Sequence, residues 1–94
     1  MNNRFVFIMP AFNAQETIAR SLLSVWMQTH QNWKIIVLDD KSTDRTVETV
    51  KGIRKMIGAS DDKIQLIVNT EKKWEVGNIV EGLKYCESND IVCR

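Results

Sequence analysis

The run Ile35-Ile36-Val37-Leu38-Asp39-Asp40-Lys41-Ser42-Thr43-Asp44 decides the fold of this chain. Four consecutive apolar residues are typical of a strand that is buried on both faces, as in a parallel sheet. Two carboxylates follow directly, and the next three polar residues give a helix-start signal. Carboxylates at the C-terminal end of such a strand lie where open α/β sheets bind their ligands. The run therefore predicts a fold and a site together.

Strands and helices alternate along the rest of the chain. Apolar runs predict strands at 4–9, 33–38, 63–68 and 90–93, with Pro10 ending the first. Apolar residues at helical spacing predict a helix after Asn13 to about Thr29, one ending at Gly58, and one from about Glu75 to Cys86. The order βαβαβαβ predicts an α/β, Rossmann-like parallel sheet with helices on both faces.

Local signals add detail to this scheme. Asn13 and Glu16 match a capping box for the first helix, and Ser42 or Thr43 is expected to cap the second. The fourth strand is short, which predicts that the sequence stops within an element.

Composition limits the function classes. Ninety-four residues allow one domain at most, or part of one. The net charge of +1 gives no electrostatic case for nucleic acid or an anionic membrane, and no apolar run approaches the ~20 residues of a membrane span. The N-terminus lacks signal-peptide features, so the cytoplasm is the expected location. Cys86 and Cys93 have no nearby His or Cys at zinc spacing and are expected to be reduced structural thiols.

Three predicted strand ends carry polar groups, at 10–13, at Asp39-Asp40 and at Asn69, and a parallel sheet brings these ends to one edge. Phe12 offers a flat apolar surface for a base, and a carboxylate accepts a strong hydrogen bond from a base N–H such as that of uracil. Lys72, Lys73 and the start of the third helix offer positive charge for a pyrophosphate. Since successive strand residues point to opposite sides, the two aspartates have different roles, and Asp40 is expected at the base.

The same residues also have structural interpretations. Lys72 and Lys73 fit a solvated loop, and for Trp74 packing on that loop is favoured over covering a nucleotide. His30 is expected to be a surface residue in a turn. For Phe12, contact with a ligand is favoured over packing.

Together the motifs carry a resemblance that covers nearly the whole chain. They are Pro10-Ala11-Phe12-Asn13, Glu16, Ser24-Val25, Gln28-Thr29 and the run Asp39 to Thr46. Their combined spacing resembles the N-terminal part of family 2 glycosyltransferases with the GT-A fold. The resemblance implies a nucleotide-sugar donor, most often a UDP-sugar. The nucleotide-binding residues that it implies are Pro10, Ala11, Phe12, Glu16, Asp39, Asp40, Asn69 and Asn78.

Some positions depart from the family pattern. Lys41 stands where Gly is common, Lys73-Trp74-Glu75 replaces a common Asn-x-Gly, and Asn78 is nearest to an expected basic residue. In the family a D-x-D motif after the fourth strand binds a divalent metal, Mg or Mn, and the catalytic base and acceptor site lie further on. All of these fall beyond Arg94, so no catalytic or metal-binding residue is expected within the chain.

Residues 1–94 are therefore expected to be the nucleotide-sugar-binding portion of an enzyme, inactive by itself, that transfers a sugar to a hydroxyl of a glycan, lipid or protein acceptor. The full-length enzyme would act in the cytoplasm or at the cytoplasmic face of a membrane. An exposed sheet edge could pair with the same edge of a second copy, so a homodimer is a further expectation.

Two rival hypotheses belong to other classes. A phosphoryl-accepting receiver-like domain also has acidic strand ends, but it needs the acidic pair after its first strand and another Asp after its third. Here those positions hold Met9-Pro10 and Asn69, which disfavours a receiver. A non-catalytic nucleotide-binding or protein-interaction domain of the same fold remains as the alternative.

Overall fold

The computed structural model describes residues 4–27, 32–86 and 90–93. Within them, one sheet contains four strands, β1 (Phe5–Ala11), β2 (Trp33–Asp39), β3 (Ile64–Val68) and β4 (Ile91–Cys93). All neighbouring strands are parallel, in the order β3-β2-β1-β4. The connecting helices are α1 (Ile18–Trp26), α2 (Thr46–Ile57) and α3 (Trp74–Leu83). The predicted α/β fold with the order βαβαβαβ is confirmed.

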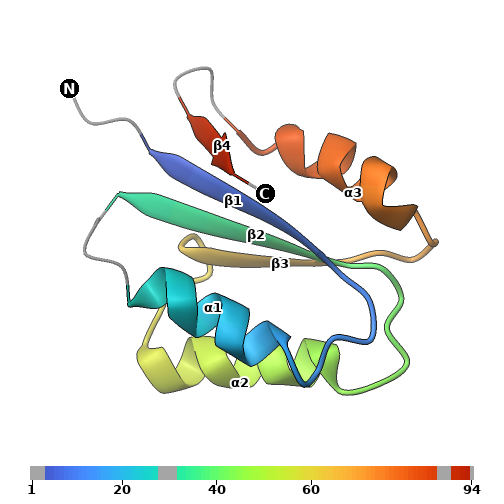
Figure 1. The fold of residues 1–94 in the computed structure, drawn as a ribbon, viewed down its shortest axis with the longest axis horizontal. Coiled ribbons are helices and arrows are strands. Elements are labelled where there is room, and N and C mark those ends of the chain that lie inside the picture. The colour runs from blue at the N-terminus through green and yellow to red at the C-terminus, as the bar shows by residue number, and fades with distance from the viewer. Residues whose placement is uncertain (1–3, 28–31, 87–89, 94) are drawn as a thin grey trace.

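Helices cover both faces of the sheet. Helices α1 and α2 lie side by side on one face, and α3 lies on the other (Figure 1). Each face has its own core, and β2 contributes Ile35 and Val37 to the first and Ile36 and Leu38 to the second. These four side chains have no exposed surface. The unbroken apolar run in the sequence thus reflects a central strand with a core on either side.

The chain reverses its direction across the sheet after β3. Strand β4 lies on the far side of β1, and α3 makes the crossing. Arg4 anchors the start of β4, because its Nε and Nη2 donate to the two carboxylate oxygens of Asp90 at 3.0 and 2.6 Å. Helix α3 approaches β1 most closely at Gly82, where an added Cβ would lie 2.7 Å from Ile8 Cγ2. Such a reversal creates a switch point beside the carboxyl ends of the strands, where open α/β sheets bind ligands.

Pro10 does not end the first strand, so that prediction is wrong. β1 continues to Ala11, with Pro10 opposite Leu38. The Phe5 N–H donates to the Asn32 carbonyl, and the Ala11 carbonyl accepts from the Asp40 N–H. The backbone N–H and carbonyl groups of the odd-numbered residues of β1 therefore point toward β2. The missing N–H of Pro10 therefore faces the β4 side, where the described part of β4 pairs only as far as Phe7. A proline is tolerated there because the described part of β4 makes no ladder bond to this position.

The predicted helix caps are also corrected. Helix α1 begins at Ile18 after Thr17, without a side-chain cap, so Asn13 and Glu16 do not form a capping box. Helix α2 begins after Arg45, later than Ser42 or Thr43. Gly58, with φ 71°, ends α2 as predicted. The turn at His30, and the expected helix end near Thr29, fall at 28–31, outside the described residues.

Candidate functional site

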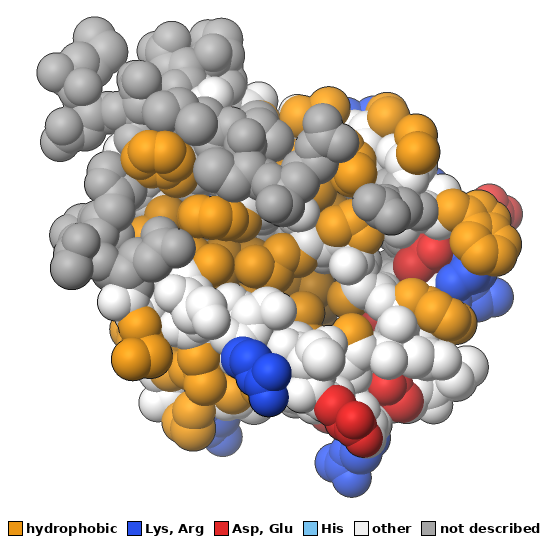
Figure 2. Space-filling model, viewed as in Figure 1, with side chains coloured by type: hydrophobic (Ala, Val, Ile, Leu, Met, Phe, Trp, Pro, Cys, Tyr) orange, Lys and Arg blue, Asp and Glu red, His pale blue; other side chains and the backbone are white. Residues whose placement is uncertain are grey.

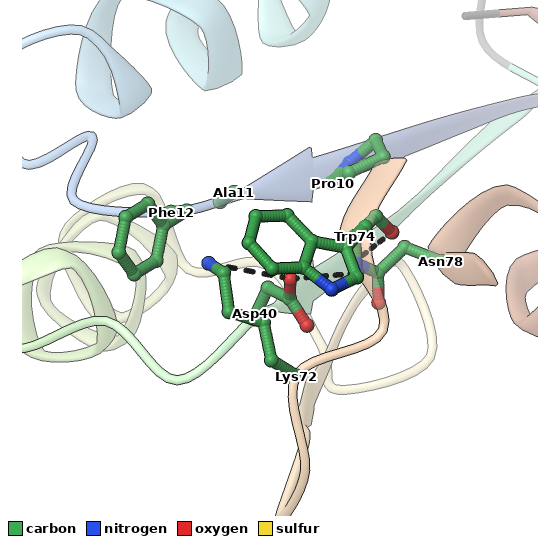
Figure 3. A pocket seen from close by; sticks show the side chains of 7 residues that line it. All are labelled: Pro10, Ala11, Phe12, Asp40, Lys72, Trp74 and Asn78. Carbon is green, nitrogen blue, oxygen red and sulfur yellow. Dashed lines mark hydrogen bonds and ion pairs between the residues drawn. The ribbon is translucent and has the colours of Figure 1, made fainter. Parts of the chain in front are cut away.

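A hollow of about 450 Å³ lies at the carboxyl edge of the sheet, where β1, β2 and the start of α3 meet. Figure 3 shows the side chains that line it: Pro10, Ala11, Phe12, Asp40, Lys72, Trp74 and Asn78. Phe12 and Trp74 are 49% and 69% exposed, so two aromatic rings border the opening. Hydrophobic, basic and acidic side chains meet at this end of α3 (Figure 2). The volume and the mixed lining are typical of a small-molecule site.

Asp40 is the buried polar centre of this pocket. Its Oδ1 accepts hydrogen bonds from the Lys73 N–H at 2.7 Å and the Asn69 amide at 3.1 Å, and its Oδ2 accepts from the Trp74 N–H at 2.9 Å. Burial by itself raises the pKa of Asp40, but these donors outweigh burial and hold the pKa well below its usual range. Asp40 is therefore a carboxylate at neutral pH and caps the positive end of α3.

The Asp40 carboxylate also holds Trp74 in place. Trp74 has φ 61°, a left-handed conformation that is unfavourable for a side chain other than glycine. Its N–H donates to Asp40, and its carbonyl accepts from the Asn78 amide at 2.8 Å. These two bonds compensate for the strain and direct the indole toward the pocket (Figure 3).

Asn69 and Asn78 form the floor beneath Asp40. Both are buried, and the Asn69 amide donates to both Asp40 and the Asn78 side-chain oxygen. The described residues show no buried side-chain polar atom without a partner. The network is therefore fully satisfied and fixes the orientation of the Asp40 carboxylate.

Asp39 has a different environment, as the alternation of strand residues predicts. It is 1% exposed, and its Oδ2 accepts from the Ser42 N–H at 3.0 Å while Oδ1 accepts from the Ser42 hydroxyl. The same Ser42 hydroxyl oxygen accepts from the Asn13 N–H at 2.9 Å. Asp39 thereby fixes the loop after β2 and, through Ser42, the loop after β1.

Further hydrogen bonds join these loops, residues 13–15 and 42–46, into what we term the loop clasp. Asn13 Oδ1 accepts from the Thr43 N–H at 2.8 Å, and the Ala14 N–H donates to the Thr46 hydroxyl at 2.8 Å. Asn13 adopts φ 49°, which turns its side chain toward the second loop rather than toward α1. The clasp lies directly after Phe12, so it positions the aromatic ring at the pocket mouth.

Lys72 lines the pocket and lies among its two aromatic rings and the Asp40 carboxylate. Its ammonium lies 3.1 Å from the centroid of the Phe12 ring, 4.7 Å from that of Trp74 and 3.6 Å from Asp40 Oδ2. Cation–π and ionic attraction both stabilise this position. From the sequence, Lys72 was interpreted either as part of a solvated loop or as a phosphate contact. Its position in the sequence did not indicate that it would contact two aromatic rings and a carboxylate.

The sequence-predicted site residues fall into three groups. Pro10, Ala11, Phe12, Asp40 and Asn78 line the pocket. Asp39 and Asn69 lie buried behind it and support its walls. Glu16 lies away from it and borders a second hollow with residues 13–15, Thr17 and Asp44.

Two residues outside the predicted set, Lys72 and Trp74, complete the pocket lining. Trp74 is largely exposed and borders the pocket, and its ring centroid lies 4.7 Å from the ammonium of Lys72 in the preceding loop, so packing on the loop stays a prediction beside a contact with a ligand. Asp40 accepts from the backbone N–H groups of Lys73 and Trp74, which lie 33 and 34 positions further on, so local sequence spacing gave no signal for this contact.

Cys86 is a free thiol packed against the core under α3. Burial raises the pKa of this thiol, which suits a structural role. The side chain of Cys93 lies outside the described residues.

The described residues contain no group of three His, Cys, Asp or Glu side chains placed to hold a metal ion. They therefore do not by themselves fit the divalent metal that the family resemblance implies. Among the same residues, none of the helices is both long and apolar enough to cross a bilayer.

Solved structures identify the class of fold. The chain aligns with a mannosyltransferase from Pyrobaculum calidifontis, solved in complex with GDP-Man and Mn²⁺, at a TM-score of 0.83 and 21% identity, over 93% of this chain and 25% of the other. It aligns with S. aureus TarS at a TM-score of 0.77 and 22% identity, over 96% of this chain and 26% of the other. The chain thus has the α/β, Rossmann-like architecture of one part of the GT-A fold.

The family follows from sequence comparison. The model of glycosyl transferase family 2 matches residues 6–93, and the chain belongs to this family. A UDP-Glc:alpha-D-GlcNAc-diphosphoundecaprenol beta-1,3-glucosyltransferase from Escherichia coli is 38% identical, over 89% of this chain and 31% of the relative. The putative glycosyltransferase EpsE of Bacillus subtilis is 33% identical, over 87% of this chain and 27% of the relative. The chain thus spans about a third or less of the length of these relatives.

Proposed function

We propose that this chain binds the nucleotide of a nucleotide-diphosphate-sugar donor, foremost a UDP-sugar, within a glycosyltransferase. The observation that carries the proposal is the pairing of an exposed aromatic ring, Phe12, with a buried, ionised carboxylate, Asp40, across one pocket. A base requires both a stacking surface and a hydrogen-bond partner.

The free position on Asp40 supports a base with an N–H donor. A carboxylate offers about two acceptor sites on each oxygen. Both sites on Oδ1 are filled by Asn69 and Lys73, whereas Oδ2 accepts one hydrogen bond, from Trp74, and otherwise faces only the Lys72 ammonium, at 3.6 Å. A ring N–H of uracil fits the remaining site on Oδ2 while the base stacks on Phe12. Asp39, Asn69 and Asn78 then act by holding the loops and the carboxylate in position, and Pro10 and Ala11 form the wall.

We further propose that the parent enzyme transfers the sugar to a hydroxyl of a glycan, lipid or protein acceptor. The Escherichia coli relative is named for UDP-Glc and for a diphosphoundecaprenol-linked acceptor, which supports a UDP-sugar donor and a lipid-linked acceptor. We propose that the parent enzyme acts in the cytoplasm or at the cytoplasmic face of a membrane. A divalent metal, Mg or Mn, would neutralise the leaving diphosphate. Its ligands and the catalytic base would belong to parts of the enzyme outside this chain, which alone would bind but not catalyse. A homodimer through an edge strand, β3 or β4, remains a proposal.

Titration with UDP, followed by NMR of the indole N–H signals, tests the binding. Trp74 borders the pocket, whereas Trp33 begins β2 at the opposite end of the sheet and packs edge-to-face on Trp26. We expect the Trp74 indole signal and the Phe12 backbone signal to shift with UDP. The indole signals of Trp26 and Trp33 serve as internal controls and should stay fixed.

Matched variants locate the site. Phe12→Leu removes the stacking ring from an exposed position and should weaken UDP binding by about tenfold or more, since stacking of a base on an aromatic ring contributes about 1–3 kcal/mol. Glu48→Gln, at an exposed position on α2 outside the pocket, should leave the affinity unchanged. If millimolar UDP moves neither the Phe12 nor the Trp74 signal, the proposal is wrong and a non-catalytic module of the same fold becomes the better hypothesis.

A further inference from the structure

The pocket contains a cation cage formed by the protein itself. Phe12 and Trp74 present ring faces, and Asp40 presents a carboxylate, to a single ammonium group, that of Lys72. The Lys72 side chain is 27% exposed, so it lies mostly within the pocket. Figure 3 shows its amino group beside the Phe12 ring.

This position conflicts with base binding. The ammonium lies 3.1 Å from the centroid of the Phe12 ring and 3.6 Å from Asp40 Oδ2, so it covers the face of the ring that looks toward the carboxylate. Stacked aromatic rings have their centroids roughly 4.5–7 Å apart, and an ammonium in contact with the ring fills that space. A base that touches both Phe12 and Asp40 must therefore displace Lys72.

We propose that Lys72 is an internal plug, which the incoming nucleotide expels from the cage and whose ammonium then pairs with the nucleotide's diphosphate. This inference rests on the proposed nucleotide binding and goes beyond it, because it assigns the pocket a preference for nucleoside diphosphates over nucleosides.

After the exchange, both charged groups still have polar partners. After Lys72 leaves, Asp40 retains the N–H donors of Lys73, Trp74 and Asn69, and a base N–H fills the free site on Oδ2. The ammonium exchanges one carboxylate for the two or more negative charges of a diphosphate. Lys72 lies two residues before Trp74, where α3 begins, and the positive end of a helix is where phosphates bind. A nucleoside must break the same cage without this compensation.

Comparison of uridine with UDP on wild type and Lys72→Ala tests the plug. Loss of the cation–π contact and the ion pair should make uridine bind about tenfold more tightly to the variant. The preference for UDP over uridine should fall by about tenfold, because the phosphate partner is lost. Lys51→Ala, an exposed lysine on α2, should change neither affinity.

A measurement without ligand checks the cage itself. The ε-methylene protons of Lys72 should resonate upfield because of the ring current of Phe12. They should return toward ordinary values in Phe12→Leu, and in wild type on addition of UDP.

The outcomes separate the two proposals. If uridine and UDP both bind but Lys72→Ala leaves the uridine affinity unchanged or weaker, the plug is wrong and the proposed function stands. An unchanged UDP preference refutes the transfer of Lys72 to the diphosphate. If neither compound binds to either chain, the proposed function fails, and this inference fails with it.

Discussion

Asp40→Asn should destabilise the fold strongly, although the substitution changes a single atom. The asparagine oxygen can still accept from Asn69 and Lys73, but the new amide group faces the Trp74 N–H at the position of Oδ2. One hydrogen bond to a charged acceptor is lost, and a buried donor is left facing another donor. Bonds to charged groups contribute about 1.5–3 kcal/mol, and an unsatisfied buried donor costs about 1–3 kcal/mol, so we expect a loss of roughly 2.5–6 kcal/mol.

The pH dependence should distinguish this mechanism from a general loss of packing. Because the pKa of Asp40 is depressed in the folded state, its contribution is fully present above the pKa of an unfolded aspartate, about 3.9. As the pH falls below this value, the unfolded chain takes up a proton first, and stability is lost until the folded carboxylate also protonates. The asparagine variant does not titrate at this position. The stability difference between wild type and variant should therefore shrink below about pH 4.

Urea unfolding followed by circular dichroism at several pH values measures this difference. Asp62→Asn changes an exposed carboxylate on the loop before β3 and serves as the control, with a change of less than about 0.5 kcal/mol. The reasoning is refuted if Asp40→Asn costs no more than Asp62→Asn. It is also refuted if the gap between wild type and Asp40→Asn is the same at pH 7 and pH 3.

Backbone and packing predictions can be checked by the same unfolding assay. Gly82→Ala should destabilise by about 1–3 kcal/mol, because its Cβ would lie 2.7 Å from Ile8, whereas Gly52→Ala in α2, with no atom within 4 Å, should stabilise by about 0.5–1 kcal/mol. Equal signs for the two glycines would contradict the close approach of α3 to β1. Lys41→Gly should stabilise by about 1 kcal/mol, since Lys41 adopts φ 62°, and a destabilised variant would show that the loop does not hold this conformation.

The strand pattern was predictable because burial on two faces leaves a local signal. The apolar run at 35–38 lies in a central strand between two cores, and any sequence that fills such a strand must be apolar throughout. The helix starts were predicted less well. Asn13 is a typical capping residue, and its side-chain oxygen does accept hydrogen bonds from backbone N–H groups. These groups belong to the loop after β2, about 30 positions away, and not to the first turn of α1 as the local spacing predicted.

The sequence by itself determined the α/β order, the family and the carboxyl edge at which Phe12 and the two aspartates meet, since these depend on periodicity and on motifs with fixed spacing. Only the tertiary structure decided what each aspartate does. Asp39 bonds to Ser42 within its own loop, whereas Asp40 caps a helix that begins 34 residues later and shares its pocket with Lys72. Contacts between distant segments depend on how α3 crosses the sheet, and the spacing of residues carries no record of that crossing.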